Sequence, residues 1–161
     1  REQTHPKDFT LSEIKSADSF KAGLLFHCFV DTARENYMQE NNVYSIMPAS
    51  KLITQTLKLL EDELFYDRLN NWGLVSSYFE KVASEELEYP IKEEDALKWH
   101  KLLQSYFSQK PSIETRKVLF ENIYFDKTSI KEVEDNLAII KSDEKVLKII
   151  ESFYKHFDKL L

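Results

Sequence analysis

The sequence predicts an all-α protein, folded as a single-domain bundle of about seven helices. The chain has 161 residues, a length that suits one domain with one core. It contains only two glycines, fewer than β-hairpins and glycine-rich phosphate loops normally require. Apolar residues recur at helical spacing between short polar or proline-marked breaks. The helices are expected near residues 11–38, 48–69, 72–86, 93–109, 112–123, 129–140 and 143–160.

Local signals set several of these helix boundaries. Pro48 lies where the first turn of the second helix is expected, a position that tolerates proline. Pro90 breaks the chain before a run of acids, which suits the first turn of the next helix because the helix dipole favours negative charge there. After Pro111, Ser112 can cap the following helix, with Thr115 near its start.

The last third of the chain predicts an amphipathic helical hairpin that serves as scaffold. Its apolar residues recur at helical spacing, and its acids and lysines are expected to form the solvated face. The predicted inner stripe consists of Val133, Leu137, Ile140, Val146, Ile149, Ile150, Phe153 and Phe157.

Composition argues against several classes of partner. A net charge of -6 without any basic block argues against a broad nucleic-acid surface. No stretch approaches the roughly 18 uninterrupted apolar residues of a membrane-spanning helix. Cys28 is the single cysteine and cannot form an internal disulfide. Because free thiols are typical of reducing compartments, we expect a cytoplasmic protein. The chain opens at Arg1 without a methionine, which leaves room for residues upstream.

Three polar residues stand out in the segment FKAGLLFHCFVDTAREN. His27, Asp31 and Glu35 are four residues apart, so they would line one stripe of a helix. The apolar residues around the start of this stripe predict a helix that is buried on nearly every side. A buried carboxylate needs a hydrogen-bond donor, a positive partner, a metal or a proton. The sequence therefore predicts a partner for Asp31.

A second acidic stripe follows in LKLLEDELFYDRLNNW. Glu63 and Asp67 are again four apart in an apolar context, whereas Glu61 and Asp62 are better explained as surface acids. Imidazole and carboxylate groups from two helices are suitable ligands for Mn, Fe or Zn. The alternative is that the residues satisfy one another locally: His27 pairs with Asp31 along its helix, and the acids pair with nearby arginines or lysines.

The two segments carry a resemblance to a known family. The run FKAGLLFHCFVDTARENYM resembles the helix of acyl carrier protein phosphodiesterases in which a histidine, an aspartate and a second acid are spaced by four. The run LLEDELFYDRLNNW resembles a later helix of that family, with Glu63, Asp67 and Trp72 in the corresponding places. These enzymes are similar in fold to the HD-type metal-dependent phosphohydrolases. Zinc-dependent phospholipase-C-like proteins share a comparable pattern.

The resemblance implies a metal-dependent phosphodiester hydrolase that acts on a small phosphoester or on acyl carrier protein. His27, Asp31 and Asp67 would hold the divalent ion, which would polarise a phosphoryl oxygen and activate a bound water. Glu35 or Glu63 would orient that water or act as base.

The chain also departs from the family pattern. Glu35 and Glu63 stand where the family has aspartates, and an early His and Asp segment is not visible before Phe9. Upstream residues or His5 would have to complete the site. The competing expectation is a non-catalytic helical binding or structural protein that retains a buried His/acid cluster.

Overall fold

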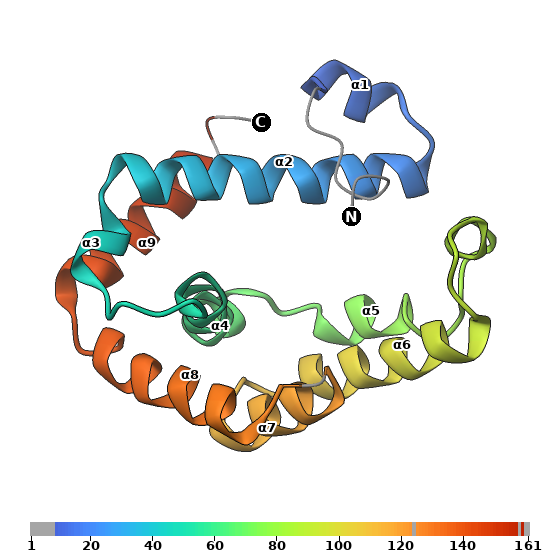
Figure 1. Cartoon of the computed structure of the whole chain (residues 1–161). Helices are drawn as coiled ribbons and strands as arrows, with labels where there is room; N and C mark the ends of the chain where they lie inside the picture. The colour runs from blue at the N-terminus through green and yellow to red at the C-terminus, as the bar shows by residue number, and fades with distance from the viewer. Residues whose placement is uncertain (1–8, 124, 158, 160–161) are drawn as a thin grey trace. The chain divides into compact units, whose positions relative to one another are not determined.

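The computed structural model describes residues 9–123, 125–157 and 159, and this part of the chain is helical without strands (Figure 1). The all-α prediction is therefore confirmed for these residues. None of the described helices is long and apolar enough to cross a membrane. The α-helices are α1 (Leu11–Ser16), α2 (Ser19–Glu40), α3 (Val43–Ile46), α4 (Ile53–Phe65), α5 (Trp72–Ser77), α6 (Glu93–Phe107), α7 (Ile113–Asn122), α8 (Lys127–Ile140) and α9 (Glu144–Phe157). Two 3₁₀ helices, η1 (Tyr66–Arg68) and η2 (Ser84–Glu88), lie between α4 and α6.

The chain groups into two compact units. Unit 1 comprises residues 1–47 and 143–161, with α1, α2, α3 and α9, and unit 2 comprises residues 48–142, with the remaining helices. Each unit is described by itself below. The single domain and the HD-like arrangement stay predictions.

In unit 1, a capping residue divides the first predicted helix. Ala17 is extended (φ -76°, ψ 159°), and the Asp18 side chain accepts a hydrogen bond from the backbone N–H of Lys21 at 2.9 Å, so a new helix begins there. The prediction of one continuous helix over 11–38 is therefore wrong at this point. The shorter α1 has its own capping box, in which Thr10 and Glu13 satisfy each other's backbone N–H groups.

The short helix α3 was not anticipated from the sequence. Asn42 precedes it in the left-handed region (φ 54°), where asparagine is one of the better-tolerated residues, and Val43 then becomes fully buried. Helix α9 packs against α2, with the rings of Phe153 and Tyr37 5.5 Å apart. Unit 1 therefore has a core of aliphatic and aromatic side chains between α2, α3 and α9.

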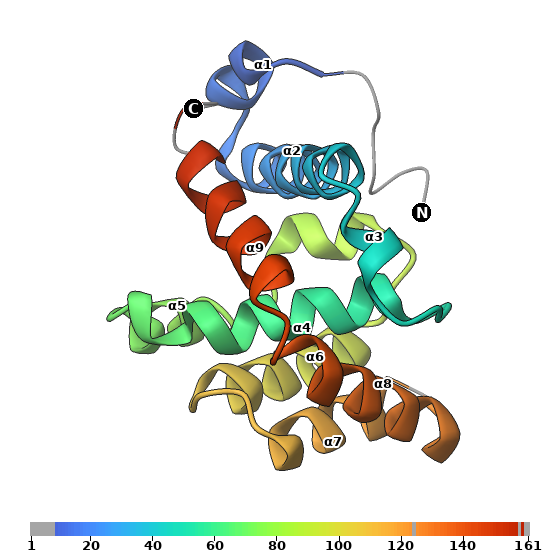
Figure 2. The same ribbon diagram turned by 90° about the vertical axis from the view of Figure 1, so that its left-hand side faces the viewer.

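Unit 2 is organised around α4 and α8, which pack against one another; α4 is seen end-on in Figure 1 and from the side in Figure 2. The helix expected from residue 48 begins only at Ile53, and Pro48 lies outside it. The chain then passes through η1 and a short α5, where a helix over 72–86 was expected. Buried side chains on α4 and α8 include Thr56, Leu57, Leu60, Val133, Leu137 and Ile140. Val133, Leu137 and Ile140 belong to the predicted inner stripe, and their burial is confirmed. The stripe residues of α9 are buried at Val146, Ile150 and Phe153 and only half-buried at Ile149 and Phe157.

A ladder of rings attaches α5 to α6. Trp72 stacks between Tyr66 and Phe107, with centroid distances of 4.8 and 5.3 Å. Two of the rings also bind backbone carbonyls: the Tyr66 hydroxyl donates to the Phe107 carbonyl at 2.9 Å, and the Trp72 indole N–H donates to the Tyr66 carbonyl at 2.9 Å. Each polar tip of these rings is thereby satisfied while the rings stay packed.

The cap predicted for α7 is confirmed. Ser112 precedes the helix in extended conformation, its hydroxyl accepts from the backbone N–H of Thr115, and the Thr115 hydroxyl accepts from the backbone N–H of Ser112. This reciprocal pair fixes where α7 begins and sets the register of Arg116 in its first turn.

Truncation of the α4 core should destabilise the protein strongly. Leu57 has no exposed surface, so Leu57→Ala leaves a cavity and should lower the free energy of unfolding by about 2–5 kcal/mol in urea titrations followed by circular dichroism. Leu74→Ala is the matched control, because 54% of Leu74 is exposed and its loss leaves no cavity. Equal effects of the two substitutions would contradict this account of the core.

Candidate functional site

The stripe on α2 exists, but it is not buried as expected. The His27 Nε2 and Asp31 Oδ2 atoms are 3.7 Å apart, with 58% of the His27 side chain and 32% of the Asp31 side chain exposed. Leu25 and Cys28 lie on the buried face of the same helix. Because adjacent helical residues point about 100° apart, His27 next to Cys28 faces away from that side. The prediction that this segment is buried on nearly every side is therefore wrong for His27, which forms a surface pair with Asp31.

Glu35, the third member of the stripe, links α2 to α3. Its carboxylate accepts hydrogen bonds from the Tyr44 hydroxyl at 2.7 Å and from the Gln39 amide at 2.8 Å. The buried guanidinium of Arg34 lies 3.8 Å from the same oxygen that Tyr44 contacts. Both carboxylate oxygens are thus engaged by neighbouring side chains, which suits a role in holding α3 in place.

The Glu63 side chain lies in a charged cluster that connects three helices. Its Oε2 atom is 3.0 Å from Nη1 of Arg116 on α7 and 2.7 Å from Nζ of Lys141 at the end of α8. Arg116 also donates two hydrogen bonds to Glu134 on α8, at 2.8 and 2.9 Å. Two cations and two anions balance in this cluster, which we call the Arg116 network.

The Arg116 side chain is the centre of this network and is only 1% exposed. Burial alone would lower the pKa of its guanidinium, but the hydrogen bonds and charges of Glu134 and Glu63 outweigh that effect and raise the pKa above its ordinary value. Arg116 therefore stays charged. It requires both acids, because an unpaired charge in this position would be very costly.

Two further acids of this region also have partners. Asp67 on η1 is exposed and forms an ion pair with Lys110. Asp62 accepts a hydrogen bond from the buried Tyr106 hydroxyl at 3.0 Å. Burial and the neighbouring Asp62 carboxylate raise the pKa of Tyr106 well above its ordinary value, so the phenol remains a donor. Glu61, expected at the surface, is instead 4% exposed.

The predicted site residues fall in different units. The predicted ligands His27 and Asp31 belong to unit 1 with Glu35, and the predicted ligand Asp67 belongs to unit 2 with Glu63. Among the described residues, no group of three or more His, Cys, Asp or Glu side chains is arranged to hold a metal ion. His5 lies outside the described residues. Within unit 1, His27 and Asp31 are the two predicted ligands that lie close to one another.

Two neighbours on α6 differ sharply in burial. Trp99 is 44% exposed, whereas the polar His100 is only 5% exposed. The His100 Nε2 atom lies 2.9 Å from Oε2 of Glu86 on η2, and the edge of the Phe79 ring packs against the imidazole. The spacing of Ala96 and His100 by four residues on the buried face of α6 was the available signal.

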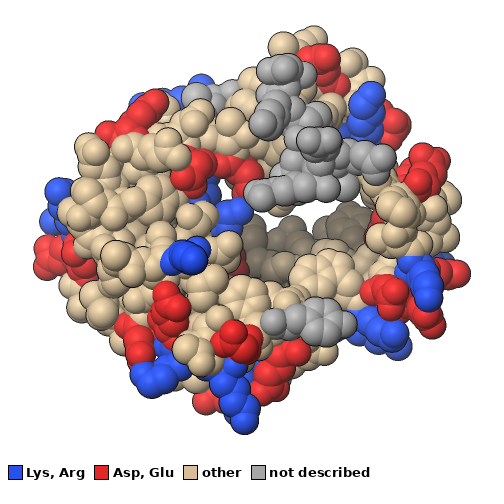
Figure 3. Space-filling view, viewed as in Figure 1, with Lys and Arg blue, Asp and Glu red and all other residues tan. Residues whose placement is uncertain are grey.

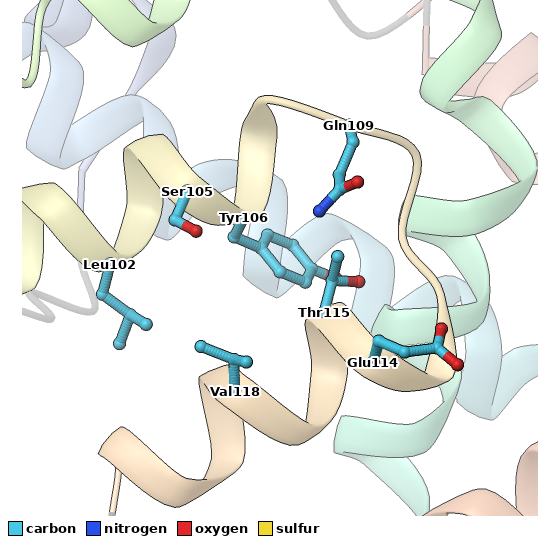
Figure 4. A pocket seen from close by; sticks show the side chains of 7 residues that line it. All are labelled: Leu102, Ser105, Tyr106, Gln109, Glu114, Thr115 and Val118. Carbon is cyan, nitrogen blue, oxygen red and sulfur yellow. The ribbon is translucent and has the colours of Figure 1, made fainter.

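The exposed Trp99 borders a groove between α6 and α7. A cavity of about 110 Å³ is lined by Leu102, Ser105, Tyr106, Gln109, Glu114, Thr115 and Val118 (Figure 4). A second, open hollow of about 440 Å³ is lined by Asp95, Lys98, Trp99, Leu102 and Asn122. Both hollows share Leu102, and we call the two together the α6–α7 groove. Its lining combines apolar side chains with polar and charged ones.

Comparison with known proteins does not assign the chain to a family. No protein-family model matches it, and neither a curated protein nor a solved structure was found to match.

Removal of one acid from the Arg116 network should cost more than removal of an exposed one. Glu63→Gln takes away a charged acceptor that both Arg116 and Lys141 contact, and we expect the free energy of unfolding to fall by about 1.5–3 kcal/mol in urea titrations. Asp67→Asn is the control, because its pair with Lys110 is at the surface and should contribute little. A loss no greater than that of the control would show that the network does not stabilise unit 2.

The Tyr106 hydroxyl should make stability depend on alkaline pH. Above about pH 10, Tyr106 of the unfolded chain loses its proton while the folded protein keeps it, so the free energy of unfolding should fall by up to about 1.4 kcal/mol per pH unit. Urea titrations over this range should show a shallower slope for Tyr106→Phe than for the wild type.

Tyr78→Phe is the matched control for this alkaline slope. Tyr78 is 71% exposed and lies outside the Tyr106–Asp62 contact, so its substitution should keep the wild-type slope. If Tyr106→Phe also keeps that slope, the phenol does not carry the pH dependence.

Proposed function

We propose that this chain is a non-catalytic helical binding protein that holds a protein segment in the α6–α7 groove. The observation that carries the proposal is the groove itself, a hollowed surface between two helices that is lined by apolar and polar side chains and includes the exposed Trp99. Grooves between helices commonly accept an amphipathic helix through a few apolar anchors.

The side chains of the groove suit a protein partner. Trp99 and Val118 are 44% and 47% exposed, and partly exposed aromatic and aliphatic residues beside a hollow are favourable contact points. Leu102 lines both hollows, and polar groups such as Gln109 and Asn122 line them as well. Apolar contact points accompanied by polar groups are usual in protein interfaces.

The acids that suggested catalysis have structural partners, which also favours this proposal. Glu63 is in the Arg116 network, Asp67 pairs with Lys110, and Glu35 binds Tyr44. A catalytic base must be free to accept a proton from substrate or water. On the proposed function Glu63 and Asp67 hold parts of unit 2 in place, so that the groove keeps its shape, and Glu35 holds α3 to α2 within unit 1.

The distribution of charged side chains gives no support to a nucleic-acid-binding surface. Figure 3 shows acidic and basic side chains interspersed over the viewed face, without one extended basic patch. With a net charge of -6, the chain does not have the clustered positive charge from which affinity for phosphate backbones mostly derives.

Selection from a phage-displayed library of random peptides tests the binding function on the purified chain. We expect enriched peptides whose affinity falls at least tenfold for Trp99→Ala and for Val118→Asp, because both side chains border the groove. The control is Ile139→Ala, which removes a 55% exposed apolar residue of α8 outside the groove lining. Peptides that bind all variants equally, or no enrichment at all, would reject the groove as the binding site.

The second candidate function is a metal-dependent phosphodiester hydrolase that acts on a small phosphoester or on acyl carrier protein. It is favoured by the accessible His27 and Asp31 pair, whose 3.7 Å separation suits two ligands of one divalent cation. Asp67 would have to leave Lys110, and Glu63 would have to leave the Arg116 network, to contribute as ligand or base. These costs place this function second.

Metal titration and a phosphodiesterase assay distinguish the two candidates. If the second is right, calorimetry with Mn²⁺ or Zn²⁺ should detect binding, and hydrolysis of bis(p-nitrophenyl) phosphate should require the metal. His27→Ala and Asp31→Asn should abolish both, while His156→Ala, a change in an exposed histidine of α9, should abolish neither. Absence of metal binding and turnover in the wild type would exclude this candidate.

A further inference from the structure

We draw no further inference here: the strongest candidate, the exposed apolar side of α5 at Leu74 and Tyr78, is a helix face for which nothing in the structure shows what covers it.

Discussion

The neutralisation of one buried guanidinium is the constraint on which unit 2 depends. Arg116 cannot lose its proton and has almost no access to water, so its charge must be balanced by carboxylates within hydrogen-bonding distance. Glu134 approaches from α8 and Glu63 from α4, and their positions fix how these helices meet α7. An apolar core alone tolerates small shifts between helices. A charge held by directed hydrogen bonds at about 3 Å tolerates far less, so the network specifies one arrangement.

The same requirement explains how well the sequence predicts the fold. Helical class, most helix positions and the cap at Ser112 follow from local signals that do not depend on distant residues. The break at Asp18 was missed because the apolar pattern continues through a residue that acts as a cap only in one backbone conformation. The helix expected over 72–86 ends early because the ring ladder with Phe107 turns the chain onto α6, a tertiary contact invisible to local periodicity.

Prediction of the candidate site was weaker, for a physical reason. Spacing correctly places His27 and Asp31 on one stripe, but the spacing of Glu63 and Asp67 does not predict the cations that Glu63 meets. Spacing does not say which charge an acid will meet, because that depends on residues far away in sequence. Arg116 lies 53 residues after Glu63, and no local pattern connects the two. The apolar residues around His27 suggested burial on all sides, yet one buried face is enough to account for them.

The adjacent residues Trp99 and His100 connect the interior of unit 2 with its surface. The His100 imidazole forms a hydrogen bond with the Glu86 carboxylate, and this bond restrains rotation of α6 about its own axis. The indole next to it consequently keeps one outward direction and one position beside Leu102. A shift of α6 by a single residue would bring Trp99 to the position of His100, which would take the indole from the surface and leave the Glu86 carboxylate facing an indole ring. The side chain that α6 presents at the surface is therefore set by a part-buried hydrogen bond made by its neighbour in sequence.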